Sequence, residues 1–510
     1  MASPYTVYLI IKYAVQHMTP LLSLLTLIYI ISAIGLATFS GAIFILLFLW
    51  IIHRNHKPVL PYVAESDLPP VLIQLPIYNE QYVVPRLLEA MTHLDYPKDR
   101  LRIQVLDDST DETVKIVADL VNHYQQNGWQ MTQVRRPIRS EFKAGAMQYG
   151  LGVDDAPFIA IFDADFVPSP DFLRQTIPHF LHNPQLGIVQ TRWAHLNAEQ
   201  NLITRSQAMS IDGHFVIEQT GRNRGGLMLS FNGTAGIWRR ACIDGSGGWT
   251  AITTAEDLDL SFRAQLRGWK YLYLPDVAVP AELPPQIAAY KAQQARWAKG
   301  VTQNLFRLIG KVWQSEHITL AQKIMATIHL CQYMPQVLLL ILTILNPILM
   351  VAGILQGLPL APLGLAGLAA PIMYVISQHQ LYPDWHKRLI AFPVLIAIGS
   401  GVMFTNTVGV FEAILRRPNN IKRTPKFSDK VWAGNQYALR TDWTILCELA
   451  LTLYNALAVI LAFRYMPSLI PLFIMQTYGF GTIVFWGMMQ ERQHGRQFTQ
   501  TKQIAPANGD

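Results

Sequence analysis

The amino-acid sequence predicts an α/β domain with a mainly parallel sheet, inserted into an α-helical transmembrane bundle. Three observations support this fold class. Only 15% of the 510 residues are charged, against about 25% in typical soluble domains. Residues 20–52 and 324–383 contain no Asp, Glu, Lys or Arg, and such runs are long enough to span a bilayer. Between them, from about residue 54 to 318, charge is normal and strand patterns alternate with helix patterns.

The N-terminal part, residues 1–53, is predicted to hold an interfacial helix at about 5–18 and a transmembrane span within 20–52. At about 1.5 Å per residue, that charge-free run would form a helix of roughly 50 Å, longer than the hydrocarbon layer of about 30 Å. We therefore expect one long, tilted helix, with two short spans breaking near Gly35 or Gly41 as the alternative. The run is too long for the core of a signal peptide.

The soluble domain, residues 54–318, is predicted to alternate strands and helices. We expect strands at residues 71–75, 102–106, 130–134 and 158–162, and helices at 82–93, 111–125 and 143–152. The first strand is expected to stop at Pro76. This βαβα order favours a mainly parallel sheet with helices on both faces. Ligands of such sheets bind beyond the carboxyl ends of the strands.

The C-terminal part, residues 319–490, is predicted to form the rest of the bundle. Its candidate spans lie near residues 325–354, 359–380, 389–411, 443–463 and 466–489. Three spans before the basic loop 416–440 would place that loop and the soluble domain on opposite sides of the membrane. If both are cytosolic, one candidate is re-entrant or interfacial. The run 389–411, with its Gly, Ser, Thr and Asn residues, is the weakest candidate.

Positive charge is concentrated in the loop 416–440, which holds seven Lys and Arg residues against one acid, Asp429. A nucleic-acid-binding patch is one interpretation. A cytoplasmic loop that follows the positive-inside bias fits the flanking apolar runs better, and the basic polar tail 491–510 is interpreted in the same way. No nucleic-acid partner is therefore expected. The three cysteines are far apart and form no CxxC, which predicts neither a zinc site nor a disulfide framework.

Two carboxylates, Asp163 and Asp165, follow the apolar strand that ends at Phe162. Side chains two residues apart on an extended segment point to the same side, so both can address one ion. Mg²⁺ is usually held by one or two carboxylates together with substrate phosphates. A nucleotide sugar, whose leaving group is a diphosphate, has this requirement. The alternative is an acidic turn that caps the helix starting near Pro170.

A second acidic pair, Asp107 and Asp108, also ends a strand, where a carboxylate can accept a hydrogen bond from the ribose or base of a nucleotide. The alternative is an N-terminal cap for helix 111–125. A third pair, Glu256 and Asp257, begins a helix. Either could deprotonate an attacking hydroxyl, although an ordinary acidic first turn would look the same.

Gln293, Arg296 and Trp297 would share one face of a helix, because they are spaced at i, i+3 and i+4. Trp offers a flat apolar face for a sugar ring, and Arg can neutralise a pyrophosphate. The alternative is an amphipathic helix with its Trp at the membrane boundary.

Together, in this order and spacing, the four motifs resemble the D, DxD, (T)ED, QxxRW signature of the family-2 processive glycosyltransferases. The resemblance is densest over residues 54–318 and closest to the cellulose-synthase-like mannan and glucomannan synthases. The stretches that carry the closer match begin at Gln104, Phe142, Phe162, Phe231 and Arg267. The resemblance implies a GT-A-like domain, an inverting transfer of a hexose from GDP-mannose or UDP-glucose to a growing β-glycan, and a bilayer location with the catalytic domain in the cytosol.

The resemblance also implies a role for each matching position. Asp107 or Asp108 would contact the nucleotide, with Tyr78 and Glu80 near its base. Asp163 and Asp165 would hold Mg²⁺ or Mn²⁺. Asp257, beside Glu256, would be the general base that deprotonates the acceptor hydroxyl. The donor and acceptor would further contact Lys143, Asn232, Gly233, Gln293, Arg296 and Trp297.

The sequence departs from the family pattern at two places. Thr254 stands one residue before the usual threonine of the (T)ED motif, which leaves the carboxylates unaffected. Trp297 is followed by Ala-Lys-Gly rather than the Cys-Gly-Pro of the plant synthases. The second departure weakens the transfer of their exact polymer specificity to this chain. Two other functions also remain open. One is a glycolipid glycosyltransferase that acts on diacylglycerol, ceramide or a polyprenyl-linked acceptor, and the other is a transporter with a non-catalytic nucleotide-binding domain.

Overall fold

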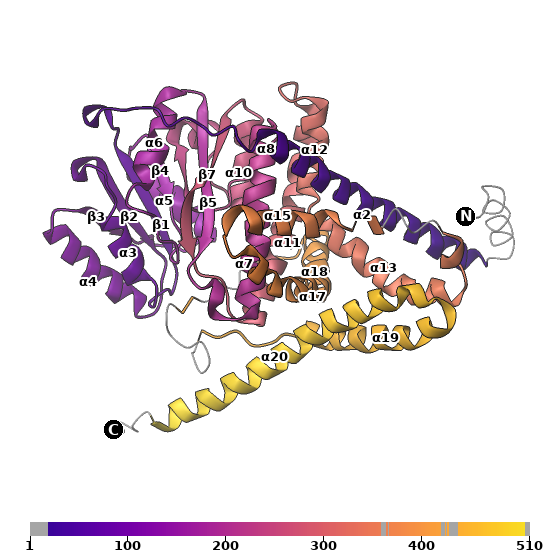
Figure 1. Ribbon diagram of the computed structural model, residues 1–510. Helices are drawn as coiled ribbons and strands as arrows, with labels where there is room; N and C mark the ends of the chain where they lie inside the picture. The colour runs from indigo at the N-terminus through magenta and orange to yellow at the C-terminus, as the bar shows by residue number, and fades with distance from the viewer. Residues whose placement is uncertain are drawn as a thin grey trace.

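The computed structural model describes residues 19–358, 364–365, 367–419, 424, 426–427 and 437–504, with side chains as far as residue 494. The expected interfacial helix at 5–18, most of the basic loop 416–440 and the end of the tail lie outside the described residues. An α/β domain occupies one part of the molecule, and long helices extend away from it (Figure 1).

The α/β domain is built on a seven-stranded sheet in the order β3-β2-β1-β4-β6-β5-β7. Strand β6 runs antiparallel to both of its neighbours, and the other pairs are parallel, so the expected mainly parallel sheet is confirmed. The strands are β1 Val71–Ile77, β2 Leu101–Asp107, β3 Gln130–Val134, β4 Phe158–Ile161, β5 Leu186–His195, β6 Gly236–Arg239 and β7 Lys270–Ala281. All four expected strands are present.

The first strand was expected to stop at Pro76. It instead continues to Ile77. Proline lacks the N–H that an inner strand uses for pairing. Here β4 pairs with β1 only as far as Gln74, so Pro76 has a strand partner on one side alone, opposite Leu106 of β2. The proline is tolerated because β1 is locally an edge.

Helices cover both faces of the sheet and bury two apolar cores. Val71 and Ile73 belong to one core and Leu72 to the other, as the alternation of side chains along a strand requires. The helices of this domain are α3 Val84–Thr92, α4 Thr113–Gln126, α5 Phe142–Leu151, α6 Phe172–His182, α7 Leu202–Gly213, α8 Thr220–Arg224, α9 Arg240–Gly245, α10 Glu256–Gln265 and α11 Ile287–Gln314. A π-helical turn, η4 His214–Gln219, joins α7 to α8.

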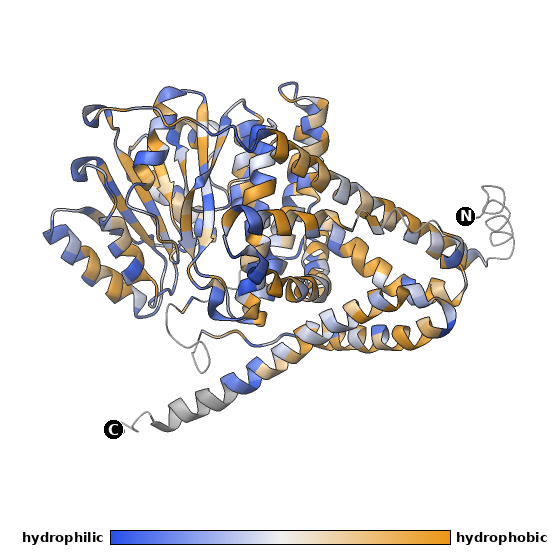
Figure 2. Ribbon diagram, in the orientation of Figure 1, coloured by the Kyte–Doolittle hydropathy of each residue, from blue (hydrophilic) through white to orange (hydrophobic). Residues whose placement is uncertain are grey.

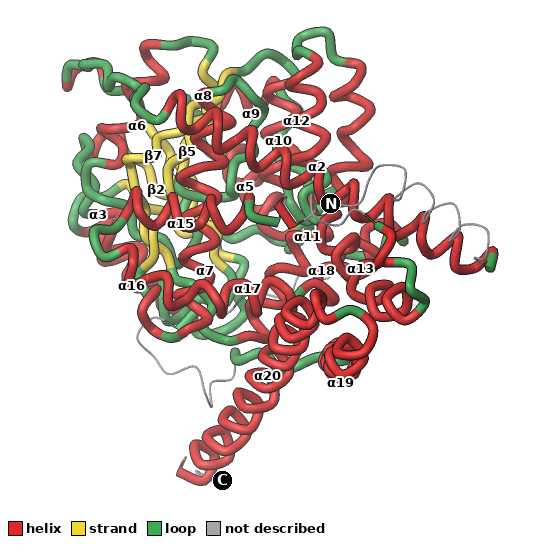
Figure 3. Tube along the Cα trace, turned by 45° about the vertical axis from the view of Figure 1, so that its right-hand side comes forward, coloured by secondary structure: helices red, strands yellow, loops and turns green. Residues whose placement is uncertain are grey.

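The remaining helices form the apolar part of the molecule (Figure 2). They are α2 Pro20–His53, α12 Leu320–Leu330, α13 Met334–Val351, α15 Ala369–Leu381, α16 Trp385–Arg388, α17 Phe392–Gly401, α18 Met403–Ile414, α19 Thr444–Tyr465 and α20 Ile470–Ile504. Helix α2 is continuous, as expected for a single N-terminal span. Helices α19 and α20 lie side by side, away from the strands (Figure 3).

Five segments among the described residues are long and apolar enough to cross a membrane: 20–53, 334–351, 385–414, 444–465 and 467–494. The segment 385–414 is included, although its run 389–411 is the weakest candidate by sequence. The candidate 359–380 lies only partly within the described residues, because 359–363 and 366 are outside them. Helix α15 has only 13 residues, which extend about 20 Å, less than the hydrocarbon layer. Within the part of the chain that the structure describes, two such segments lie between the α/β domain and the basic loop.

Candidate active site

A cavity of about 310 Å³ lies beyond the carboxyl ends of β1, β2 and β4. Every residue that the sequence singled out lines it, with one exception. The lining residues from that set are Tyr78, Glu80, Asp108, Lys143, Asp163, Asp165, Asn232, Gly233, Glu256, Asp257, Gln293, Arg296 and Trp297. The strands and helices therefore bring the four motifs, which extend from residue 107 to residue 297 of the sequence, to one place.

The exception is Asp107, which does not line the cavity. It is 1% exposed, and its carboxylate accepts hydrogen bonds from the backbone N–H of Ser109 at 2.9 Å and from Gln133 at 2.7 Å. Neighbouring residues at a strand end point to opposite sides, so only one of the acidic pair can face the cavity. The structure assigns that place to Asp108 and gives Asp107 a supporting role in the loop.

Two arginines lie beside Asp108, and one of them, Arg139, lines the cavity. Arg136 donates two hydrogen bonds to its carboxylate, at 2.8 and 2.6 Å. The guanidinium of Arg139 lies 3.5 Å from the ring centre of Tyr78. These arginines were not identified from the sequence. They make this end of the cavity suited to an anionic ligand with a planar base.

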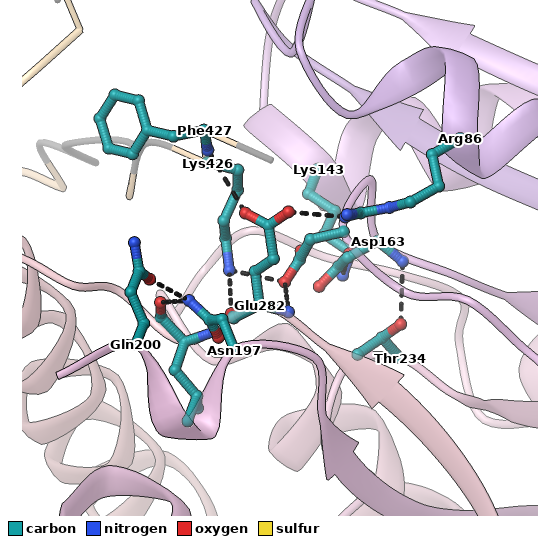
Figure 4. A network of polar contacts seen from close by, with 11 residues as sticks. Arg86, Lys143, Asp163, Asn197, Gln200, Thr234, Glu282, Lys426 and Phe427 are labelled. Carbon is teal, nitrogen blue, oxygen red and sulfur yellow. Dashed lines mark hydrogen bonds and ion pairs between the residues drawn. The ribbon is translucent and has the colours of Figure 1, made fainter. Parts of the chain in front are cut away.

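Each aspartate of the Asp163/Asp165 pair contacts a lysine. Asp163 and the two lysines, Lys143 and Lys426, are labelled in Figure 4. Lys143 Nζ lies 2.5 Å from Asp163 and also donates to the carbonyl of Gly233. Burial lowers the pKa of Lys143, but the nearby carboxylates outweigh this effect and the net direction is upward. Lys143 is therefore an ammonium that can contact a phosphate.

Asp165 is buried, and its Oδ2 accepts from Lys426 at 2.6 Å and from the backbone N–H of Glu282 at 3.2 Å. Glu282 in turn pairs with Arg86 at 2.7 Å (Figure 4). No sequence pattern pointed to Glu282. Lys426 was noted only as part of the basic loop, and no local pattern linked that loop to a strand end 261 residues away.

The chemistry of this pair fits a hard divalent cation. Both carboxylates line the same cavity, and the side chain of Asp163 is 36% exposed. Among the described residues, no group of three or more His, Cys, Asp or Glu could enclose a metal ion. A site with two carboxylates, completed by water and substrate phosphates, is the usual arrangement for Mg²⁺.

Asp257 lies in the first turn of α10, as the sequence predicted. Burial and the adjacent Glu256 raise its pKa to about 7, against the smaller opposing effects of Lys143 and Arg296. Gly233 adopts φ +81°, and a Cβ there would lie 3.1 Å from Asp257 Oδ2. A glycine at this turn thus permits the close approach of the backbone to the carboxylate.

A second cavity, of about 350 Å³, shares Asp257, Asn232, Gln293 and Trp297 with the first. Trp193 also lines both cavities. Further aromatic walls of the second cavity include Phe215 of the π-helical turn, Tyr290 of α11 and Tyr333, which directly precedes α13. Gln293, Arg296 and Trp297 lie on helix α11, as expected from their spacing. Asp257 therefore lies where two adjoining cavities meet.

Comparison with known protein families matches residues 69–300 to the model described as "Glycosyltransferase like family 2". These residues include all four motifs.

Comparison with curated proteins finds plant relatives. The chain is 43% identical over 269 residues to glucomannan 4-beta-mannosyltransferase 1 of Oryza sativa subsp. japonica, covering 52% of this chain and 51% of the relative. It is 46% identical over 249 residues to glucomannan 4-beta-mannosyltransferase 2 of Arabidopsis thaliana, covering 48% and 46%. The chain thus spans about half the length of the curated relatives it matches.

Among solved structures, the fold is similar to a mannosyltransferase from Pyrobaculum calidifontis in complex with GDP-Man and Mn²⁺. The TM-score is 0.47 at 21% identity, over 76% of this chain and 99% of the other.

Proposed function

We propose that the chain is an inverting membrane glycosyltransferase, because residues 69–300 match the glycosyltransferase family 2 model. It transfers a hexose from a nucleotide sugar, GDP-mannose or UDP-glucose, to a growing β-glycan of the mannan, glucomannan or glucan type. The observation that carries this proposal is the position of Asp257, a carboxylate with a raised pKa at the junction of two cavities.

We assign the first cavity to the donor. Asp108, Tyr78 and Glu80 bind the nucleoside, with the arginines beside Asp108 supporting its carboxylate. Lys143 and Arg296 bind the diphosphate through their positive charge. Asp163 and Asp165 would hold Mg²⁺ or Mn²⁺, which neutralises charge that develops on the leaving diphosphate.

We assign the second cavity to the acceptor. Its aromatic walls suit the apolar faces of sugar rings, and Trp297 and Gln293 lie at the boundary between the two cavities. An acceptor hydroxyl that reaches this boundary comes beside Asp257, which removes its proton as the hydroxyl attacks the anomeric carbon.

The donor and product can be identified with the detergent-purified protein. We expect radiolabel from GDP-mannose, UDP-glucose or both to enter a polymer that a β-mannanase or a β-glucanase degrades. The names of the plant relatives favour mannose. The measurement is incorporation from each donor, followed by sizing of the product.

A short, solvent-extractable glycolipid from either donor would instead support the alternative acceptor, a diacylglycerol, ceramide or polyprenyl carrier. Nucleotide binding without transfer to glycan, lipid or water would contradict enzymatic activity altogether.

We also propose that the α/β domain and the basic loop 416–440 both face the cytosol, of a bacterial inner membrane or of a Golgi membrane, where nucleotide sugars are made. The positive-inside bias supports this. The two apolar segments found between them among the described residues, which leave out 359–363 and 366, also agree with it.

Cysteines placed at Ser140 and at Ser428, which lies outside the described residues, are expected to resist an impermeant thiol reagent in intact bacterial cells and to react after lysis. The background variant replaces Cys331 and Cys447, the two native thiols that are not buried, with serine. Labelling of one site and protection of the other in intact cells would overturn the shared orientation.

A further inference from the structure

The π-helical turn η4, His214–Gln219, lies on the wall of the acceptor cavity. π-Helical turns are rare and occur mostly at functional sites. In an α-helix, residues five apart point about 140° away from each other. The wider π turn instead directs both of its end residues to one side chain, that of Asn232.

The hydrogen bonds around Asn232 fix the orientation of its amide. Gln219 Nε2 lies 3.3 Å from the carbonyl of Ser230, which can only accept, so the nitrogen of the Gln219 amide faces this way. The same nitrogen donates to Asn232 Oδ1 at 2.6 Å. The Asn232 Nδ2 group therefore faces His214 Nε2, at 3.0 Å.

The donor and acceptor roles of the two His214 ring nitrogens follow from that orientation. Because Asn232 donates to Nε2, this nitrogen accepts, and the N–H of the ring is at Nδ1. Nδ1 donates to Glu218 Oε2 at 2.9 Å. Glu218 thus fixes the tautomer of His214. His214 and Gln219 together fix the orientation of the Asn232 amide.

The same turn is connected to the proposed base. The backbone N–H of Phe231 donates to Ser261 Oγ at 2.7 Å, and that hydroxyl donates to the Asp257 carbonyl at 2.5 Å. Asn232 and Asp257 both line the two cavities at their junction. An amide held at this point can bind a sugar hydroxyl beside the carboxylate that deprotonates it.

We propose that His214, Glu218 and Gln219 are positioning residues for the acceptor: through Asn232 they orient the attacking sugar hydroxyl toward Asp257. This inference rests on the proposed function. It predicts a loss confined to transfer to the glycan, because none of the three is among the described residues that line the donor cavity.

The test compares three activities of the membrane-embedded protein: nucleotide binding, donor hydrolysis with water as acceptor, and transfer to an oligosaccharide. His214→Phe keeps a planar ring and removes both nitrogens. We expect transfer to fall roughly 5- to 100-fold, as for loss of one buried hydrogen bond, with a raised acceptor KM. Donor affinity and hydrolysis should stay within about twofold of the wild type.

His214→Gln and Glu218→Gln supply the second set of variants. In His214→Gln, the side-chain carbonyl of the introduced glutamine would restore an acceptor for Asn232, so transfer should recover in part relative to His214→Phe. The double variant Glu218→Gln/His214→Phe should lower transfer no more than His214→Phe alone, because the two residues act through the same series of hydrogen bonds. The matched control is His179→Phe, a buried histidine on α6 that lines neither cavity.

An equal loss of hydrolysis and transfer in His214→Phe would mean a general structural role and overturn the inference. Unchanged transfer in His214→Phe would also overturn the inference, but it would leave the proposed function intact. A wild-type protein that transfers to no glycan would overturn the proposed function, and this inference with it.

Discussion

Replacement of Asp257 by Asn is expected to lower sugar transfer by about 10²–10⁴-fold, the range that positioned acid–base groups contribute. The inverting displacement leaves one proton to remove from the attacking hydroxyl. Asp163 and Asp165 are assigned to the diphosphate, and Asp257 is the carboxylate at the junction of the cavities. Nucleotide affinity, measured by calorimetry, should change little. Loss of donor binding would instead indicate a structural or metal-linked role.

The dependence of transfer on pH should follow the ionisation of the Asp257 carboxylate. A base must be ionised to accept a proton, and the pKa of Asp257 is raised to about 7. We therefore expect kcat/KM to rise about tenfold per pH unit below that pKa and to level off above it. The rising limb should vanish from the residual activity of Asp257→Asn.

Glu256→Gln is the matched control for Asp257→Asn. It removes a carboxylate charge one residue away and replaces it with an amide of nearly equal size. It should remain active. Because the charge of Glu256 raises the pKa of Asp257, its removal should shift the rising limb to lower pH. An inactive Glu256→Gln beside an active Asp257→Asn would assign the base to Glu256.

Asp163→Asn and Asp165→Asn are each expected to reduce transfer by about 10³-fold or more. Metal-assisted charge stabilisation contributes several kcal/mol, and each 1.36 kcal/mol corresponds to tenfold in rate. Donor affinity should fall in both variants, and it should depend less on added Mg²⁺ or Mn²⁺ than in the wild type. The measurements are nucleotide binding and transfer across a metal titration, with a chelator at its start.

The control is Asp171→Asn, an exposed acid in the next loop that accepts a hydrogen bond from Ser169 and lines neither cavity. It should bind donor and transfer sugar normally. Thermal unfolding should be recorded for Asp165→Asn, because Lys426 then loses a buried anion. Near-normal turnover of Asp165→Asn without added metal would show the metal assignment to be wrong.

Local sequence patterns were enough to predict the fold class and most of the site. Hydrophobic periodicity is local, so it located β1 to β4 and the continuous span α2. The acids at strand ends were predicted to meet because parallel strands present their carboxyl ends at one edge. Asp108, Asp163 and Asp257 do line one cavity.

Which side chains complete that site depends on tertiary packing. Asp107 and Asp108 are equivalent in sequence, and only the pleat of β2 with its neighbour Gln133 selects one of them. Lys426 reaches Asp165, and the π turn at His214 reaches Asn232, through contacts that no local pattern encodes. Periodicity and spacing specify the face of an element on which a residue lies. The partner of that residue is fixed only when distant segments pack together in the folded chain.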